Sequence, residues 1–213
     1  MPPEDRVVPR FAAEPPQELL PYGRWAERLR EEFLAACLRL EGDLGDPGDL
    51  VFHPDRTWSG RTYVPVTCRT STGLELYGLV SYAPALEEGE DPTHFAATAD
   101  WTEETVDENP DWTIDLCDEV IDTWRGELGK EAAMTVVWGT PVVDGAMVAT
   151  AELGGLTVDQ CAVTERRFTL VAPDDYRGDT LEIALFDGRG RELARESLYD
   201  EDDEDDEGAD GTA

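Results

Sequence analysis

Residues 133–153 read AMTVVWGTPVVDGAMVATAEL, and this stretch is the most informative part of the chain for its fold. Two apolar runs rich in β-branched residues, Ala133–Gly139 and Ala146–Leu153, are separated by Asp144-Gly145. Such runs are typical of buried strands, and an Asp-Gly dipeptide between them favours the tight turn of a β-hairpin. We therefore expect two antiparallel strands here, joined by a hairpin turn.

Strand-like runs extend from this stretch in both directions along the chain. Towards the C-terminus they are Gln160–Ala172, Leu181–Asp187 and Glu192–Leu198, and the last two are linked by the turn sequence 187–190. Towards the N-terminus they are Leu50–His53, Arg61–Arg69, Leu74–Tyr82 and His94–Trp101. Arg61–Arg69 and Leu74–Tyr82 flank the turn sequence 70–73 and predict a second hairpin. Short strands with tight turns and no alternating helices indicate antiparallel sheets and disfavour a doubly wound α/β fold.

Residues 21–41 are predicted to form a helix. Their apolar residues recur at steps of three and four: Tyr22, Trp25, Leu29, Phe33, Cys37 and Leu40. Pro21 suits the first turn of a helix and Gly42 suits its end. Because only one face is apolar, this helix should cover a sheet. The expected fold class is therefore α+β, mainly β, with one long N-terminal amphipathic helix covering antiparallel sheets.

Residues 112–125 fit two patterns. Cys117, Val120, Ile121 and Trp124 recur at helical spacing, whereas Trp112, Ile114 and Leu116 alternate as in a strand. We favour the strand, because the β region that follows carries the same kind of residues.

The two ends of the chain differ from the middle. Residues 1–18 contain five prolines and are expected to be a flexible Pro-rich arm. Residues 200–213 begin with eight consecutive acids and are expected to be a disordered acidic tail. Residues 19–199 are expected to be a single mainly-β globular domain.

The charge of the chain is strongly negative. It has 49 acidic and 17 basic residues, which give a net charge of −32. Three interpretations remain open: adaptation to high salt, a surface that attracts a basic protein, and a DNA mimic that competes with nucleic acid for a basic groove. Direct binding of nucleic acid is not expected, because like charges repel.

Other features limit the location and the chemistry. No apolar run has the length of a membrane span or of a signal peptide, so we expect a soluble cytoplasmic protein with free thiols. No glycine-rich phosphate-binding motif and no GxSxG elbow is present, and the chain has two histidines. Acidic neighbours should raise the pKa of the Cys117 thiol and make it a poor nucleophile. We therefore nominate no catalytic residue and no cofactor.

Two sets of residues are candidate partner-binding residues. The first is Trp58 with its neighbours Arg56 and Arg61, where an exposed tryptophan beside arginines would suit a protein contact, unless Trp58 folds back on the sheet. The second is the acidic tail: Asp200, Glu201, Asp202, Asp203, Glu204, Asp205, Asp206 and Glu207.

One acidic stretch is a candidate site for Ca²⁺ or Mg²⁺, which prefer oxygen ligands. Its members are Glu103, Glu104, Asp107, Glu108 and Asp111. A solvated acidic turn is the alternative interpretation of the same residues.

These observations favour a non-catalytic accessory protein that binds a partner, such as a basic protein, through its acidic surface and tail. A small-ligand-binding protein or enzyme with a pocket between helix 21–41 and the sheet is an alternative. An acidic DNA mimic is a further alternative.

Overall fold

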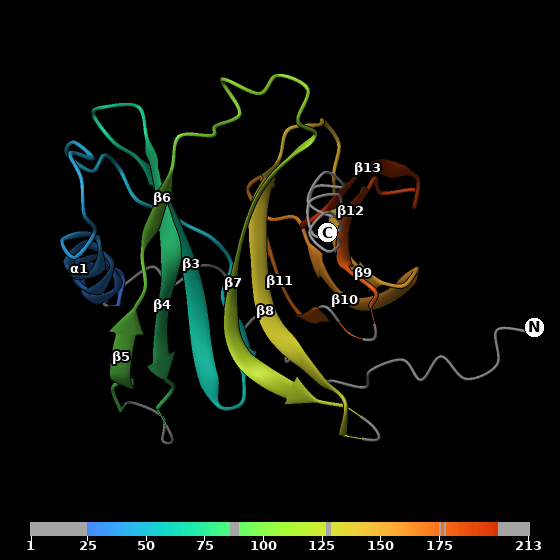
Figure 1. The fold of residues 1–213 in the computed structure, drawn as a ribbon, viewed down its shortest axis with the longest axis horizontal. Coiled ribbons are helices and arrows are strands. Elements are labelled where there is room, and N and C mark those ends of the chain that lie inside the picture. Colours follow the sequence, from blue (N-terminus) through green and yellow to red (C-terminus); the bar gives the residue numbers. More distant parts are fainter. Residues whose placement is uncertain (1–24, 86–89, 127–128, 175, 177, 200–213) are drawn as a thin grey trace, which may run out of the picture.

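The computed structural model describes residues 25–85, 90–126, 129–174, 176 and 178–199. Within these residues the protein is mainly β, with one helix and antiparallel strand pairs. Figure 1 shows four layers from left to right: the helix α1 and then three sheets. The predicted fold class, mainly β with a helix over antiparallel sheets, is confirmed at this level.

The first sheet lies directly against α1. Its strands are β1 (Val51–Phe52), β2 (Arg56–Trp58), β3 (Arg61–Arg69), β4 (Glu75–Ala83), β5 (Thr93–Ala97) and β6 (Asp100–Thr102). The order is β1-β3-β4-β5, with β2 also paired to β3 and β6 to β4. The predicted hairpin of β3 and β4 is confirmed, whereas the single strand expected at His94–Trp101 is divided into β5 and β6.

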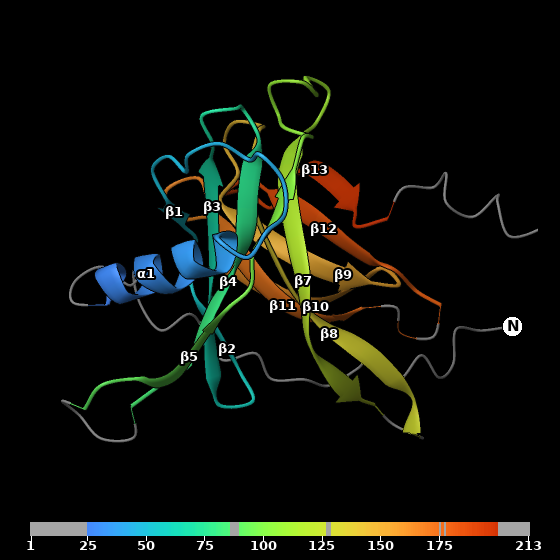
Figure 2. The same ribbon diagram turned by 60° about the vertical axis from the view of Figure 1, so that its left-hand side comes forward.

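The helix α1 (Ala26–Cys37) lies across the strands of the first sheet (Figure 2). Leu29 and Phe33 are fully buried against Val64, Val66 and other side chains of that sheet. The spacing of four residues places both side chains on one face, so the predicted amphipathic stripe is confirmed for the described residues.

The helix is shorter than the range 21–41 that the sequence predicted. After Cys37 the hydrogen bonds change, because the N–H groups of Arg39 and Leu40 donate to carbonyls three residues back rather than four. Such tighter bonds are common at helix ends, and they lead here into Gly42 at a φ of 120°. Residues 21–24 lie outside the described part.

The middle sheet has apolar layers on both faces. It contains β7 (Ile114–Arg125), β8 (Glu131–Pro141) and β11 (Phe168–Asp174), in the order β11-β8-β7. Residues 112–125 therefore contain a strand, as favoured from the sequence. Trp138 and Val171 pack towards the first sheet, whereas Val137 and Leu170 pack towards the third. This two-sided burial explains why these strands have continuous apolar runs.

The third sheet closes the stack. It contains β9 (Val148–Leu153), β10 (Leu156–Ala162), β12 (Leu181–Phe186) and β13 (Glu192–Ser197), in the order β10-β9-β12-β13. The turn at 187–190 joins β12 and β13 as predicted. Ile183 and Leu185 are fully buried towards the middle sheet.

The prediction of a β-hairpin at Asp144-Gly145 is wrong. A turn does form, and Gly145 has a φ of 86°, but β8 and β9 belong to different sheets. The reason is that both sides of β8 are occupied by β7 and β11, so the chain after the turn must join another sheet. The single strand expected at Gln160–Ala172 is divided into β10, which belongs to the third sheet, and β11, which belongs to the middle sheet.

Arg56 joins these sheets from within. Its side chain is 2% exposed, and its Nη2 lies 3.0 Å from Oδ2 of Asp159, which follows a bulge in β10. Arg56 also donates to the carbonyl oxygens of Thr169, at 2.8 Å, and Gln160, at 3.1 Å. The Asp159 carboxylate accepts the N–H of Val171 at 2.9 Å. A single guanidinium thus connects β2 with β10 and β11.

Two predicted regions lie outside the described residues: the Pro-rich arm 1–18 and the acidic tail 200–213. In the part of the chain that the structure describes, no helix has the length and apolar character needed to cross a membrane.

Replacing Arg56 by methionine tests the importance of this connection. Arg56→Met leaves the Asp159 carboxylate buried beside two carbonyl groups without their donor. We expect a loss of about 3–5 kcal/mol in the free energy of unfolding, measured by urea denaturation. The control is Arg191→Met, which removes an exposed pair with Asp187 and should change the same quantity far less, because solvent screens exposed ion pairs. Equal effects of the two substitutions would contradict the role of Arg56.

Candidate functional site

An acidic groove runs between the first and middle sheets, along β4 and β7. It consists of three cavities, and neighbouring cavities share lining residues, among them Glu75, Tyr77 and Asp118. We define the acidic groove by its six carboxylates: Glu75, Asp100, Glu104, Asp115, Asp118 and Glu119. They come from β4, β6, β7 and the turn after β6, so folding brings together acids that are far apart in the sequence.

Strand alternation places these acids in the groove. On β4, Leu76 and Val80 pack towards α1, so Glu75 and Tyr77 point the other way, towards the middle sheet. On β7, Ile114 packs towards the third sheet, so Asp115 faces the first. Successive side chains of a strand point to opposite faces, and this rule accounts for the orientation of Glu75, Tyr77 and Asp115.

Aromatic and hydroxyl groups complete the wall of the groove. Tyr77 and Trp112 line the same cavity as Glu75. The hydroxyl of Thr98 donates a hydrogen bond of 2.7 Å to Oε2 of Glu119 and holds that carboxylate in place. The groove therefore combines fixed negative charge with aromatic faces, a combination that suits cations.

Burial raises the pKa values of Glu75 and of three carboxylates on β7. The pKa of Glu75 rises to about 7, chiefly because its side chain is removed from water and further because of the negative charge of Asp115. Burial also raises the pKa values of Asp115, Asp118 and Glu119. Ionisation of these buried groups costs free energy, and a cation placed beside them would offset part of that cost.

Arg69 is the one basic residue among the described residues that line these cavities. Its Nε lies 3.8 Å from Oε2 of Glu75, and its Nη2 lies 3.2 Å from Oδ2 of Asp107. Its positive charge lowers the pKa values of Glu75 and Asp115, but burial outweighs this effect at both.

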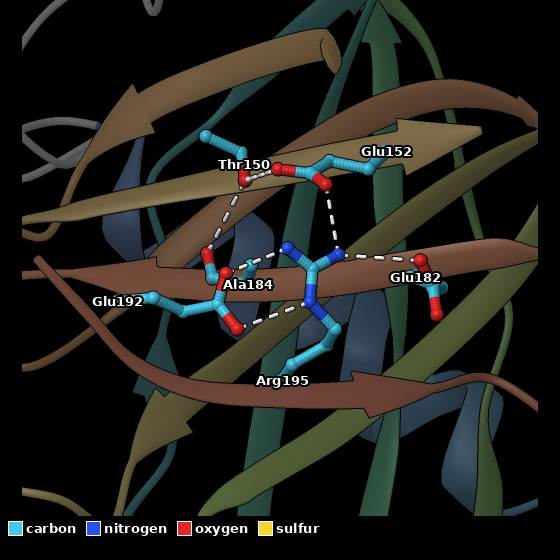
Figure 3. Close-up of polar contacts among 6 residues, drawn as sticks. All are labelled: Thr150, Glu152, Glu182, Ala184, Glu192 and Arg195. Carbon is cyan, nitrogen blue, oxygen red and sulfur yellow. Dashed lines mark hydrogen bonds and ion pairs between the residues drawn. The ribbon is translucent and has the colours of Figure 1, made fainter. Parts of the chain in front are cut away.

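Acids on the third sheet have a different environment. Figure 3 shows Arg195 between the carboxylates of Glu152, Glu182 and Glu192. Its Nη1 lies 2.8 Å from Glu152 and 3.2 Å from Glu182, and its Nη2 lies 2.7 Å from Glu192. These hydrogen bonds lower the pKa of Glu192. Each of these three carboxylates thus contacts the Arg195 guanidinium, whereas in the groove Arg69 pairs with Glu75.

One end of the groove is a cavity of about 230 Å³ that reaches the interior. Glu75, Asp115 and Arg69 line it together with two buried side chains, His53 and Trp138. Among the described residues, neither Nδ1 of His53 nor Nε1 of Trp138 has a hydrogen-bond partner. We call this cavity the deep end of the groove.

The protonation states at the deep end follow from burial. Burial, and to a smaller extent the positive charge of Arg167, lower the pKa of His53 to about 3, so the imidazole is neutral. The main chain of Gly139 opposes part of this lowering of the pKa. Burial, with the charges of Glu75 and Asp115, raises the pKa of Cys117 well above its usual value, as its acidic neighbours predicted. Cys117 is therefore a poor nucleophile, and Glu75 is the group that can exchange a proton near neutral pH.

The first candidate partner-binding set lies mostly inside the protein. Arg56 is buried in the ion pair with Asp159, so it is not available as a surface contact, contrary to the expectation from the sequence. Trp58 is half-buried and packs against the apolar cluster between the first and middle sheets, which fits the alternative in which it folds back on the sheet. Arg61 donates to the Ser81 hydroxyl and to the His94 carbonyl, both at 2.9 Å. The tail set lies outside the described residues.

The candidate metal-binding stretch does not converge on one point. Glu104 lines the groove, Asp107 pairs with Arg69, and the other members, Glu103, Glu108 and Asp111, are exposed. Within the described ranges, no group of three or more metal-ligating side chains is placed to hold an ion. The turn itself forms as expected, with the Thr102 hydroxyl accepting the N–H of Glu104 at 3.0 Å.

The interface between α1 and the first sheet is filled by apolar side chains, including Leu29, Phe33 and Val64. This packing does not favour the alternative of a ligand pocket beneath the helix. All four cysteines are unpaired, as predicted.

Sequence reasoning missed the carboxylates of β4 and β7 because 49 acids make any single one undiagnostic. One signal was available. Asp115, Cys117, Glu119 and Ile121 alternate along one face of β7, and an acid that shares a face with Cys117 and Ile121 must be partly buried.

Comparison of this chain with protein-family models, with curated proteins and with solved structures gives no match. The functional argument therefore rests on the groove itself.

The pKa of Glu75 predicts a pH-dependent effect of Glu75→Gln on stability. The folded state holds the Glu75 proton up to about pH 7, whereas an unfolded chain releases it near pH 4.5, so this group lowers stability as the pH rises through that interval. Glutamine removes the penalty. We expect Glu75→Gln to stabilise the protein by up to about 3 kcal/mol at about pH 8 and to have little effect at about pH 4.

Urea denaturation at both pH values measures this difference. Glu131→Gln, the same change at an exposed residue paired with Arg125, is the control and should show no comparable pH-dependent gain. A Glu75→Gln variant that is destabilised at about pH 8 would show that the ionised carboxylate is needed for the fold.

Proposed function

We propose that this protein is a non-catalytic binding protein whose acidic groove receives a basic segment of a partner protein. The observation that carries the proposal is the groove itself, where six carboxylates gather between two sheets beside a single lining arginine. A partner's lysine and arginine side chains would supply the missing positive charge.

Electrostatics and aromatic contacts support this function. Burial, and to a smaller extent neighbouring carboxylates, raise the pKa values of Glu75 and Glu119, and cations in the groove would favour their ionised forms. Tyr77 and Trp112 offer faces for cation–π contacts with arginine or lysine. The net charge of −32 would also speed the encounter with a basic protein.

Adaptation to high salt does not account for the groove. That adaptation works through acids that remain hydrated at the surface, whereas the side chain of Glu75 is 15% exposed. Burial disfavours the ionised form of a carboxylate, and a partly buried carboxylate adds little to surface hydration. High-salt adaptation therefore does not explain why Glu75 lies in the groove.

A test with a basic peptide follows from the groove geometry. We expect a peptide of about ten residues, rich in lysine and arginine and acetylated at its amino terminus, to bind with an affinity that falls at least about tenfold between about 50 mM and 500 mM NaCl. The double variant Asp118→Asn, Glu119→Gln should weaken binding by at least about fivefold, measured by isothermal titration calorimetry.

The matched control is Asp144→Asn, Glu131→Gln, which removes the same charge from exposed residues away from the groove. Equal weakening by both double variants would mean that net charge, and not the groove, attracts the peptide. Competition between duplex DNA and the protein for a basic DNA-binding domain, with no dependence on Asp118 and Glu119, would instead favour the DNA mimic.

The acidic tail is expected to assist this binding. Deleting residues 200–213 removes eight consecutive acids. The deletion should weaken the binding of the basic peptide by about two- to tenfold at low salt, with a smaller effect at high salt. Calorimetry with the full chain and the shortened chain measures this change. Identical affinities would limit the function to the folded part.

A further inference from the structure

The edge of the middle sheet formed by β7 has no further strand beside it in the part of the chain that the structure describes. The order of this sheet is β11-β8-β7, and β7 pairs with β8 alone. With twelve residues β7 is the longest described strand (Figure 1). A strand at the edge of a sheet presents a row of unpaired main-chain groups, and an extended segment of another molecule can pair with them.

The alternation of hydrogen bonds along β7 identifies these unpaired groups. The N–H of Val142 donates to the carbonyl of Thr113 at 3.0 Å, and opposite residues of an antiparallel pair alternate between hydrogen-bonded and non-bonded positions. The odd-numbered residues in the first half of β7 therefore bond to β8. Leu116, Asp118 and Val120 direct their N–H and C=O groups away from β8, and we call these three residues the free edge of β7.

The free edge has defined limits along the strand. Before it, Ile114 is 3% exposed and leaves no room for a partner. After it, beyond the bulge in β7, the N–H of Thr123 is taken by Oδ1 of Asp122 at 2.7 Å. Between these limits Asp118 is exposed, and Val120 is 59% exposed. A strand added here would therefore pair over a short stretch of about five residues.

The opposite edge of the same sheet is closed. There the carbonyl of Thr169 and the N–H of Val171, both on β11, are taken by the side chains of Arg56 and Asp159. Within the described ranges no side chain forms such a bond to the free edge of β7. The middle sheet is thus open to an added strand at β7 and closed at β11.

Two cavities lie along the free edge, on the side of the first sheet. One, of about 160 Å³, is lined by Cys117, and the next, of about 190 Å³, is lined by Glu119, while Asp118 lines both. Cys117 and Glu119 are two residues apart on one face of β7, so alternate side chains of an added strand would reach the two cavities in turn. Carboxylates of the acidic groove line both cavities, and lysine or arginine side chains would complement them.

We infer that the basic segment of the partner binds as an added antiparallel strand along the free edge of β7. Its main chain would exchange hydrogen bonds with Leu116, Asp118 and Val120. Its basic side chains, at alternate positions, would enter the two cavities. This inference rests on the proposed function and adds to it a conformation and a sequence pattern for the bound segment.

The antiparallel direction determines that pattern. Every strand pair in the described part of the chain is antiparallel. In an antiparallel pair the residues that hydrogen-bond to the free edge lie opposite Asp118 and Val120, and their side chains share the face of Val120. A β-branched residue suits this face. The residues between them carry the basic side chains, so basic and β-branched residues should alternate.

A second copy of this protein does not suit the free edge. The described edge strands of the other sheets with five residues or more are β5, β10 and β13, and Arg195 is their one lysine or arginine. Three glutamates already contact its guanidinium. Pairing with a second copy would therefore bring little positive charge to Asp118 and Glu119. A basic helix could bring the charge but could not pair with the free edge, because its main-chain groups bond within the helix.

Methylation of the peptide main chain tests the inference directly. The probe is an acetylated peptide of about ten residues in which lysine and valine alternate. Methylation of the valine nitrogens removes the N–H groups that would face β7, whereas methylation of the lysine nitrogens removes those that would face away. We expect the first to weaken binding at least about tenfold and the second by about twofold or less, measured by isothermal titration calorimetry.

A substitution on the free edge provides a second test. Val120→Pro removes one N–H from the free edge and keeps the pairing with β8, because proline is tolerated on an edge strand where its nitrogen faces solvent. We expect it to weaken the alternating peptide at least about fivefold. The control Val120→Thr keeps the N–H and a β-branched side chain and should change the affinity by about twofold or less. Thermal melting establishes that both variants fold, and if Val120→Pro does not, the methylated peptides decide.

Hydrogen exchange measured by NMR locates the added strand. With the unmethylated peptide at saturation, the N–H groups of Leu116, Asp118 and Val120 should exchange at least about tenfold more slowly than in the free protein. The valine-methylated peptide at the same concentration should not slow them. Binding without this slowing would contradict strand addition.

The outcomes separate this inference from the proposed function. If all three peptides bind alike and their binding responds to Asp118→Asn, Glu119→Gln, the groove function stands and the inference fails. A greater loss on methylation of the lysine nitrogens than of the valine nitrogens would also overturn the inference. If none of the basic peptides binds, the groove function fails and the inference fails with it.

Discussion

The buried guanidinium of Arg56 is the one polar side chain described above that contacts strands of all three sheets. It donates to Asp159, Thr169 and Gln160, so one side chain of the first sheet satisfies acceptors on strands of the other two. The Asp159 carboxylate in turn accepts the N–H of Val171. A buried charge pair stabilises a fold only when its remaining hydrogen bonds are satisfied, and here each partner has them. Arg56 therefore fixes a point of contact between β2 and the middle sheet, and β2 is paired through β3 to β4, which borders the acidic groove.

Much of the fold could be predicted from residue patterns. The stripe of Leu29 and Phe33 predicted the helix, and the turn residues at 70–73 and 187–190 predicted two of the observed hairpins. Local signals failed where the answer depended on distant strands. Asp144-Gly145 does form a turn, but a dipeptide cannot reveal that β8 already has a neighbour on each side. The end of the helix was also missed, because hydrogen bonds and not apolar spacing decide where α1 stops.

The candidate site was harder to predict, and the reason lies in the composition. Acids are so numerous that a glutamate such as Glu75 has no distinguishing feature until its depth is known. For Arg56 the sequence was misleading in another way. A charged residue near a tryptophan suggested an exposed surface, but the Arg56 side chain is buried. Trp138 could be assigned to a buried strand, but the missing partner of its N–H depends on three-dimensional packing. Residue type indicated the kind of chemistry, and tertiary structure determined where it could occur.

The two edges of the middle sheet have opposite consequences for self-association. At the β11 edge, side chains of Arg56 and Asp159 occupy main-chain groups that another strand would need. At the β7 edge no strand of the described part adds to the sheet, and Asp118 and Glu119 lie along it. An unpaired strand edge can recruit an edge from a second molecule, and repulsion between like charges opposes this. Burial raises the pKa values of both acids. As the pH falls, they should therefore become protonated, and lose their mutual repulsion with a second molecule, at a higher pH than ordinary surface carboxylates would.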